Sequence, residues 1–203
     1  AMGIELFHNF TLVHDDIMDD APLRRGQSTV HEKWNLNTAI LSGDVLFVDA
    51  FEKVSTVDEI YLKDVLNIFV KTAREVCEGQ QKDMDFESEM DVSEEEYIHM
   101  IQFKTSVLLG CALQIGAIIS GASKPDADHL YQFGLSLGTS FQIKDDYLDA
   151  FGDPEKFGKQ VGGDIISNKK TILFIKALEL ANPSQKKALG ALLNETDFDK
   201  KVR

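Results

Sequence analysis

Apolar residues recur mostly at spacings of three and four along this chain, and alternating runs bounded by turn residues are scarce. Such spacing is typical of helices that bury one face, so we expect an all-α fold and no strands. The pattern predicts helices at about 1–20, 30–34, 37–57, 58–86, 93–122, 125–148, 169–180 and 183–193. Residues 21–27 are predicted to be a loop, and the stretch 152–168 is glycine-rich and charged.

Several helix starts carry capping residues. Ser93 with Glu96 three positions later has the spacing of a capping box, and Pro125 suits the first turn of a helix. Asn182 followed by Pro183 has the form of an N-cap with a first-turn proline. The most apolar run, 107–122, is shorter than the roughly 20 residues that cross a bilayer. We therefore expect it to be a buried helix and expect no transmembrane segment.

The composition adds constraints on partners and location. The 203 residues include 21 Lys and Arg against 34 Asp and Glu, a net charge of −13, so nucleic acid is not an expected partner. The 2 cysteines form no Cys-x-x-Cys pair, which predicts neither a disulfide framework nor a zinc site. A reduced, cytoplasmic location fits best. No repeat or linker divides the chain, so we expect a single domain.

Two clusters of aspartates follow apolar helical sequence: Asp15-Asp16-Ile17-Met18-Asp19 and Asp145-Asp146-Tyr147-Leu148-Asp149. At about 100° per residue, the three aspartates of each cluster fall within one sector of a helix. Like charges placed in this way repel, and acidic residues near a helix C-terminus oppose the helix dipole. The arrangement therefore costs stability unless cations bind there, and oxygen ligands favour hard divalent cations.

A single acidic cluster in an acidic protein is as often a solvated surface as a ligand site. Two copies embedded in apolar sequence favour two facing metal sites. An EF-hand is disfavoured because its central Gly and terminal Glu are missing, whereas Mg²⁺ commonly bridges a carboxylate to a phosphate. Basic residues follow both clusters and would help to bind a diphosphate: Arg24, Arg25, Lys159, Lys169 and Lys170.

With these motifs assembled, the chain resembles the trans-isoprenyl diphosphate synthase (polyprenyl synthetase) family, in its short-chain type such as farnesyl or geranylgeranyl diphosphate synthase. The matching segments are 12–19 with Arg24-Arg25-Gly26, Gly79-Gln80-Gln81-x-Asp83, Lys104-Thr105, 141–149, Gly158-Lys159 and Lys169. The resemblance implies an isoprenoid-synthase-type helical bundle around a central cavity.

The resemblance also implies chain elongation in isoprenoid biosynthesis. An allylic diphosphate is ionised with the help of Mg²⁺, about three ions, and isopentenyl diphosphate attacks the cation. The residues implied to be catalytic are Asp15, Asp16, Asp19, Asp145, Asp146, Asp149 and Lys104, and the implied metal ligands are Asp15, Asp16, Asp19, Asp145 and Asp149. The implied substrate-binding residues are His8, Arg24, Arg25, Lys104, Thr105, Gln142, Lys159 and Lys169. A homodimer is expected on the same ground.

Product length is expected to depend on side chains before the first aspartates. Thr11 and Phe7 lie four and eight residues before Asp15, and Phe10 lies five before it. The family's length rules single out these positions and suggest a product of C15 to C20. Helical geometry turns Phe10 about 140° away from Asp15, which weakens its part in this expectation.

The sequence departs from the family in one element. A Gly-Gly-Lys-x-x-Arg motif that holds isopentenyl diphosphate in the family does not occur here. We therefore expect 1–203 to be a partial domain that lacks N-terminal and C-terminal helices and that binds Mg²⁺-diphosphate but elongates poorly. Robust elongation by the purified chain would contradict this.

Three other interpretations stay open. A terpene cyclase would share the bundle but usually carries Asn/Asp-x-x-Ser/Thr-x-x-x-Glu as its second metal motif. A noncatalytic regulatory subunit should have lost aspartates or arginines from the motifs. An acidic helical interaction domain would leave the paired motifs unexplained.

Overall fold

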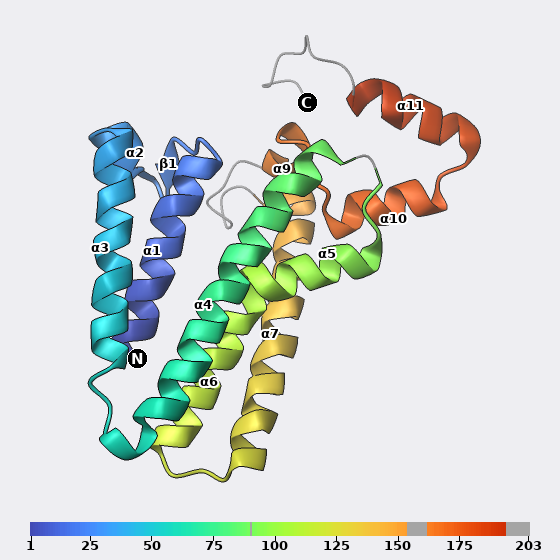
Figure 1. The fold of residues 1–203 in the computed structure, drawn as a ribbon. Coiled ribbons are helices and arrows are strands. Elements are labelled where there is room, and N and C mark those ends of the chain that lie inside the picture. Colours follow the sequence, from blue (N-terminus) through green and yellow to red (C-terminus); the bar gives the residue numbers. More distant parts are fainter. Residues whose placement is uncertain (90, 154–161, 194–203) are drawn as a thin grey trace.

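Helices fill most of this computed structural model, which describes residues 1–89, 91–153 and 162–193 (Figure 1). The elements are α1 (Met2–Met18), β1 (Leu23–Arg24), β2 (Gln27–Ser28), α2 (Val30–Lys33), α3 (Leu36–Val54), α4 (Glu59–Ser88), α5 (Glu94–Ile101), the π-helical segment η1 (Gln102–Ser106), α6 (Val107–Ile119), α7 (Lys124–Phe151), α9 (Gly163–Ile166), α10 (Ile172–Leu180) and α11 (Pro183–Leu193). The all-α expectation is confirmed.

Capping residues begin the helices where the sequence predicted. Ser93 and Glu96 form a reciprocal capping box at the start of α5. The side chain of Ser123 accepts a hydrogen bond from the Asp126 backbone N–H at the start of α7, with Pro125 in the first turn. Asn182 accepts hydrogen bonds from the backbone N–H groups of residues 184 and 185 at the start of α11. These caps accept hydrogen bonds from backbone N–H groups of the first turn, which have no partner within the helix.

The expectation of no strands was wrong at one place. Residues 21–27, predicted to be a loop, contain β1, which pairs with β2 in an antiparallel ribbon. Arg25 and Gly26 occupy the two turn positions with φ of 53° and 76°. Positive φ at both central positions is typical of a tight two-residue hairpin, and Gly26 adopts it without steric cost. The apolar periodicity could not reveal a ribbon of two-residue strands.

The helices form two packed groups (Figure 1). Helix α1 packs along α3, while α4, α6 and α7 run side by side as a second group. A shared core joins the two groups and includes Phe7, Val65, Phe69, Val107 and Cys111. The C-terminal ends of α1, α4 and α7 all point to the same end of the bundle, so both aspartate motifs lie at that end.

Helix α6 lies in the core between α4 and α7, as expected for the most apolar run. It continues α5 through η1, whose wider turn contains Lys104 and Thr105. Among the described residues, the stretch Glu94–Ile119 is long and apolar enough to cross a membrane, with a mean hydropathy of 1.4, and 44% of its most apolar window is buried. Core helices pass the same test, so the absence of a transmembrane segment stays a prediction.

Candidate active site

The last turn of α1 carries the first aspartate motif, and the β1–β2 hairpin returns the chain to it. Arg24 Nε donates to Asp16 Oδ1 at 2.8 Å, and Arg24 Nη2 lies 3.1 Å from Asp15 Oδ2. Asp16 is only 4% exposed. Burial opposes the charge on Arg24, but the two carboxylates outweigh it and raise the pKa of Arg24. The hairpin thus brings a fixed positive charge to the end of α1.

Two lysines from distant elements meet the same motif. Lys104, on η1, places Nζ 3.1 Å from Asp15 Oδ1 and 2.6 Å from Asp83 Oδ2 on α4. Lys169, between α9 and α10, places Nζ 3.4 Å from Asp19 Oδ2 and 3.7 Å from Asp83 Oδ2. Asp83 therefore connects the two lysines. Through Lys169, the segment that follows the second motif contacts the first motif across 150 residues of sequence.

Burial and the neighbouring charges together shift the pKa values of the aspartates and lysines in this cluster. Burial disfavours the charged form of Asp15, but Lys104, Lys169 and Arg24 outweigh it and hold the pKa of Asp15 below its usual value. Burial, reinforced by Asp15, raises the pKa of Asp19. The pKa of Lys104 is raised, because Asp15 and Asp83 outweigh its burial. The lysines stay charged and can bind anions.

The second motif lies on the last two turns of α7. Asp146 is 4% exposed and accepts hydrogen bonds from the Tyr97 hydroxyl and, at 3.3 Å, from the Ile172 backbone N–H. Gln142 Nε2 donates to its other oxygen at 3.2 Å, and Thr105 donates to Gln142 Oε1 at 3.3 Å. Of the predicted substrate-binding residues, Gln142 therefore contacts the second motif directly, and Thr105 reaches it through Gln142.

Asp149, on α7, lies next to Asp164, on α9. Asp149 is 8% exposed, and its Oδ2 accepts from the Asp164 backbone N–H at 3.0 Å. Gly162, with a φ of 80°, donates its N–H to the Asp149 carbonyl at 2.7 Å. Burial, followed by the charge of Asp149, raises the pKa of Asp164 to about 7. Asp145 lies half-buried on the same helix.

Some predicted residues are not gathered at this cluster. His8 lies on α1, 3.9 Å from Glu5, and Arg25 is exposed in the hairpin turn. Within the described residues, neither forms a hydrogen bond or ion pair with a motif aspartate. Lys159 lies outside the described residues. The substrate-binding role implied for His8 and Arg25 therefore stays a prediction.

The predicted length-determining side chains lie deeper along α1. Phe7 is fully buried and contacts Phe69 with ring centroids 5.4 Å apart. Phe10 is half-buried and stacks on Phe47 at 5.0 Å. Thr11 donates to the His8 carbonyl of its own helix. These positions form part of the packing between α1, α3 and α4.

Three residues of the cluster were not predicted as site residues: Asp83, Tyr97 and Asp164. Asp83 ends the segment Gly79-Gln80-Gln81-x-Asp83 that resembles the family, so the sequence contained a signal for this residue. Asp164 follows Gly162-Gly163, and two glycines let the backbone come close to a neighbouring group. Tyr97 lies 49 residues from its partner, and its helix pattern gives no sign of that contact.

The carboxylates of the two motifs are suitable ligands for Mg²⁺. Asp15 Oδ1 is buried, and the ammonium group of Lys104 lies 3.1 Å from it. Carboxylate oxygens are the ligands that a hard divalent cation prefers. Over the described chain, the only group of at least three acidic, His or Cys ligand atoms within 4.8 Å of one another is Asp20, His31 and Glu32. Within the described part of the chain, no three motif aspartates therefore bring their oxygens this close together, and Lys104 and Lys169 lie between the first motif and Asp83.

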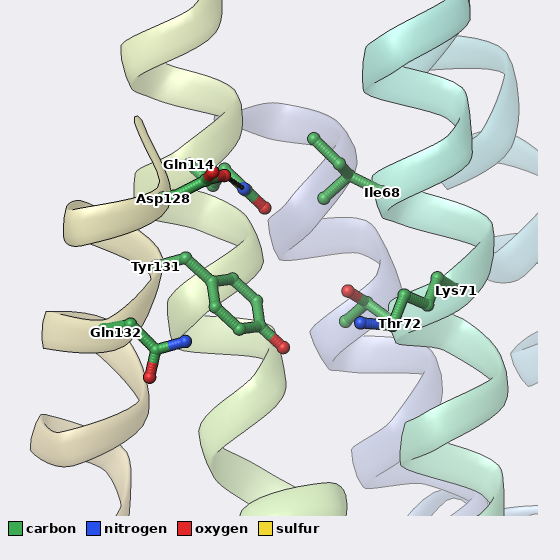
Figure 2. A pocket seen from close by; sticks show the side chains of 7 residues that line it. All are labelled: Ile68, Lys71, Thr72, Gln114, Asp128, Tyr131 and Gln132. Atoms are coloured by element: carbon green, nitrogen blue, oxygen red, sulfur yellow. Dashed lines mark hydrogen bonds between the residues drawn. The ribbon is translucent and has the colours of Figure 1, made fainter. Parts of the chain in front are cut away.

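Two cavities lie away from the cluster. One of about 410 Å³ opens between α4, α6 and α7 and is lined by polar side chains such as Lys71, Gln114 and Tyr131 (Figure 2). Its carboxylate, Asp128, is already bound by Gln114 at 2.9 Å and by Lys124 at 2.7 Å. Another of about 380 Å³ lies between α5 and α10. Neither cavity contains a motif aspartate.

An all-α bundle with two aspartate motifs and basic residues at one end suits a class of protein that binds anions together with a divalent metal. The comparisons with known proteins narrow this class. The polyprenyl synthetase family model matches residues 1–203, and the chain belongs to this family.

Individual relatives agree with this assignment. The chain is 46% identical to the short chain isoprenyl diphosphate synthase of Methanothermobacter thermautotrophicus over 97% of its length. It is similar to a crystal structure of geranylgeranyl pyrophosphate synthase, with a TM-score of 0.92, 50% identity and 98% of this chain covered. A polyprenyl synthase from Caulobacter crescentus CB15, complexed with calcium and isoprenyl diphosphate, has a TM-score of 0.86 at 32% identity over 98% of this chain.

The chain spans only part of these relatives. It covers 61% of the Methanothermobacter protein, 62% of the geranylgeranyl pyrophosphate synthase chain and 61% of the Caulobacter chain.

Proposed function

We propose that this protein is a trans-prenyltransferase that condenses isopentenyl diphosphate with an allylic diphosphate. The carbon–oxygen bond of the allylic substrate breaks, diphosphate leaves, the double bond of isopentenyl diphosphate forms the new carbon–carbon bond, and a proton is lost. The observation that carries this proposal is the meeting of Lys104 and Lys169 with Asp15, Asp19 and Asp83. It combines anion-binding cations with carboxylates that suit a divalent metal.

The family match and the second motif favour this function over the alternatives. The second motif here is Asp145-Asp146-x-x-Asp149, unlike the usual second motif of terpene cyclases. Both motifs keep all their aspartates, and Arg24 and Arg25 are present, which is not expected of a noncatalytic subunit. The relatives described above are named as isoprenyl or geranylgeranyl diphosphate synthases or as a polyprenyl synthase.

The basic residues would bind and orient the diphosphate. In this structure, Lys104, Lys169 and Arg24 are paired with carboxylates. A diphosphate must compete with those carboxylates for the cations, so its binding is favoured when the aspartates are neutralised in another way. Mg²⁺ held by Asp15, Asp19 and Asp145 would supply that neutralisation and stabilise the charge that develops on the leaving group. Arg24 offers a guanidinium with the geometry to contact two phosphate oxygens.

The proposal includes a short product of C15 to C20. A substitution at Phe10 tests the expected control of product length better than one at Phe7. Phe7 is fully buried in the core, so its truncation would disturb the fold. If Phe10 limits the chain, Phe10→Ala shifts the product to longer chains in a sizing assay. An unaltered product from Phe10→Ala would remove Phe10 from the length-determining set.

The proposal also includes a cytoplasmic homodimer. Both cysteines are free, which suits a reducing compartment. On α3, Leu41, Val45 and Val48 share one helix face and are 64%, 58% and 66% exposed. A continuous exposed apolar face is typical of a protein–protein interface. Sedimentation should give a dimer for the wild type and a monomer for Val45→Glu; a monomeric wild type would contradict the homodimer.

The central test is binding of inorganic diphosphate, measured by calorimetry with and without Mg²⁺. We expect binding that requires Mg²⁺, that is lost in Asp15→Asn and in Asp145→Asn, and that is unchanged in Asp64→Asn, a matched change at an exposed position of α4. Incubation with isopentenyl diphosphate and each allylic primer, followed by product sizing, then tests the transfer. Undiminished binding in both motif variants would remove the metal assignment.

A further inference from the structure

Asp146 differs from the other motif aspartates in how completely the protein surrounds it. One oxygen accepts from the Tyr97 hydroxyl and from the Ile172 backbone N–H at 3.3 Å. The other accepts from Gln142 Nε2 at 3.2 Å. These donors come from α5, α10 and α7, so a single carboxylate connects three helices.

The contrast with Asp15 separates two roles. The oxygens of Asp15 face the charged side chains of Lys104 and Arg24, each at 3.1 Å, whereas both oxygens of Asp146 accept from uncharged donors. A metal at Asp146 would have to displace buried donors, and a buried donor without an acceptor is costly. Asp146 is therefore suited to fix the position of the last turns of α7, on which Asp145 and Asp149 lie.

Tyr97 is the long-range donor in this arrangement. It is 2% exposed and packs in the second core cluster with Met100, Ile101 and Ile175. Burial, followed by the charge of Asp146, raises the pKa of Tyr97, so its hydroxyl keeps the proton that it donates. The hydroxyl of Tyr97 thus links α5, which leads into the Lys104 segment, to the carboxylate that also holds the first residue of α10.

We propose that Tyr97 is a positioning residue of the site. Its hydroxyl holds Asp146, and through Asp146 it sets the second motif and the α10 junction that follows Lys169. The expected effect of Tyr97 on metal affinity rests on the proposed function, whereas the contact between Tyr97 and Asp146 does not. Residues of this kind, which orient ligands without binding the metal, typically change metal affinity by about 10- to 100-fold when removed.

The test is Tyr97→Phe, which keeps the ring in the core and removes only the donor. Tyr131→Phe is the matched control, because Tyr131 is half-buried on α7 beside the remote cavity of Figure 2. We expect Tyr97→Phe to weaken Mn²⁺ binding in the presence of inorganic diphosphate by about tenfold or more. Hydrogen exchange of the Ile172 amide in the metal-free protein should also become about tenfold faster, while Tyr131→Phe changes neither.

A second variant separates positioning from ligation. Asp146→Asn keeps an oxygen that can accept from Tyr97, so it should retain Mn²⁺ affinity within a few-fold, whereas Asp145→Asn should lose at least about tenfold. Loss in Asp146→Asn as large as in Asp145→Asn would overturn the positioning role, and this comparison stands even if Tyr97→Phe does not fold.

The two proposals fail in different ways. If the wild type binds no Mn²⁺ with diphosphate, the proposed function fails, and the exchange of the Ile172 amide alone decides the role of Tyr97. If Tyr97→Phe folds and leaves both the exchange rate and the Mn²⁺ affinity unchanged, the role of Tyr97 is refuted while the proposed function stands.

Discussion

Gly79 lies where α4 crosses the π-helical segment, and a methyl group there has no room. A Cβ built on Gly79 would lie 2.6 Å from the Phe103 carbonyl carbon and 2.7 Å from the Lys104 Cα, and it would also meet the Lys104 backbone nitrogen. All three are backbone atoms, so no side chain can turn away. To reach ordinary contact at 3.4 Å, the two helices must separate by more than about 0.8 Å, because the Lys104 backbone nitrogen is the closest of the three atoms. Gly79→Ala should therefore destabilise the fold.

The size of the effect follows from two opposing terms. Overpacking of a tight contact costs about 1–3 kcal/mol, and the rigid neighbours place Gly79→Ala at the upper end of that range. Replacing a helical Gly by Ala returns about 1 kcal/mol of helix propensity. The net loss is about 2 kcal/mol, which for a chain of this size lowers Tm by roughly 4–8 °C. Separation of the helices also moves Lys104, so diphosphate binding should weaken.

Gly116→Ala is the matched control. Gly116 also lies inside a helix, α6, but a Cβ there would meet nothing within 4 Å. Only the propensity gain remains, so this variant should raise Tm by roughly 2–4 °C. Thermal unfolding of the three proteins under one buffer tests the reasoning. A Gly79→Ala protein as stable as Gly116→Ala would show that the helices do not cross as closely as the structure places them.

Three further predictions concern stability and reactivity. Phe7→Ala should lower the free energy of unfolding by about 3–5 kcal/mol in urea denaturation, because it leaves a cavity in the core; a loss below 1 kcal/mol would contradict the full burial of Phe7. Ser93→Ala removes the capping box shared with Glu96 and should cost about 1 kcal/mol, whereas Ser93→Asp, which keeps a side-chain acceptor, should cost less. Burial raises the pKa of Cys111 to about 11, so at pH 8 Cys111 remains a thiol and iodoacetamide should modify the exposed Cys77 first; equal native labelling of both would refute this.

Much of the fold was predictable because its signals are local. The capping box at Ser93 and the proline at 125 depend on residues within one turn, and the structure has helices beginning there. The apolar spacing of three and four likewise predicted α1, α3, α4 and α7 close to their observed bounds. The hairpin at Arg25 and Gly26 was missed because two-residue strands are too short to show an alternating pattern.

The candidate site was predictable only in part. The two aspartate motifs stand out in the sequence, because three like charges on one helix sector are costly without a bound cation. That Asp83 pairs with both Lys104 and Lys169 could not be read from spacing, since these residues come from α4, η1 and the α9–α10 junction. Their proximity depends on how three helices pack.

The sequence by itself determined where the helices form and which turns carry the acidic and basic residues, because helix propensity, capping and charge repulsion act over a few neighbouring residues. Tertiary structure alone decided which of those charges meet. It brought Lys169 to Asp19 across 150 residues and placed the Tyr97 hydroxyl on Asp146. Contacts over such separations depend on how buried helix faces pack together. The same local pattern is compatible with many packing arrangements, so the pattern alone does not determine which contacts form.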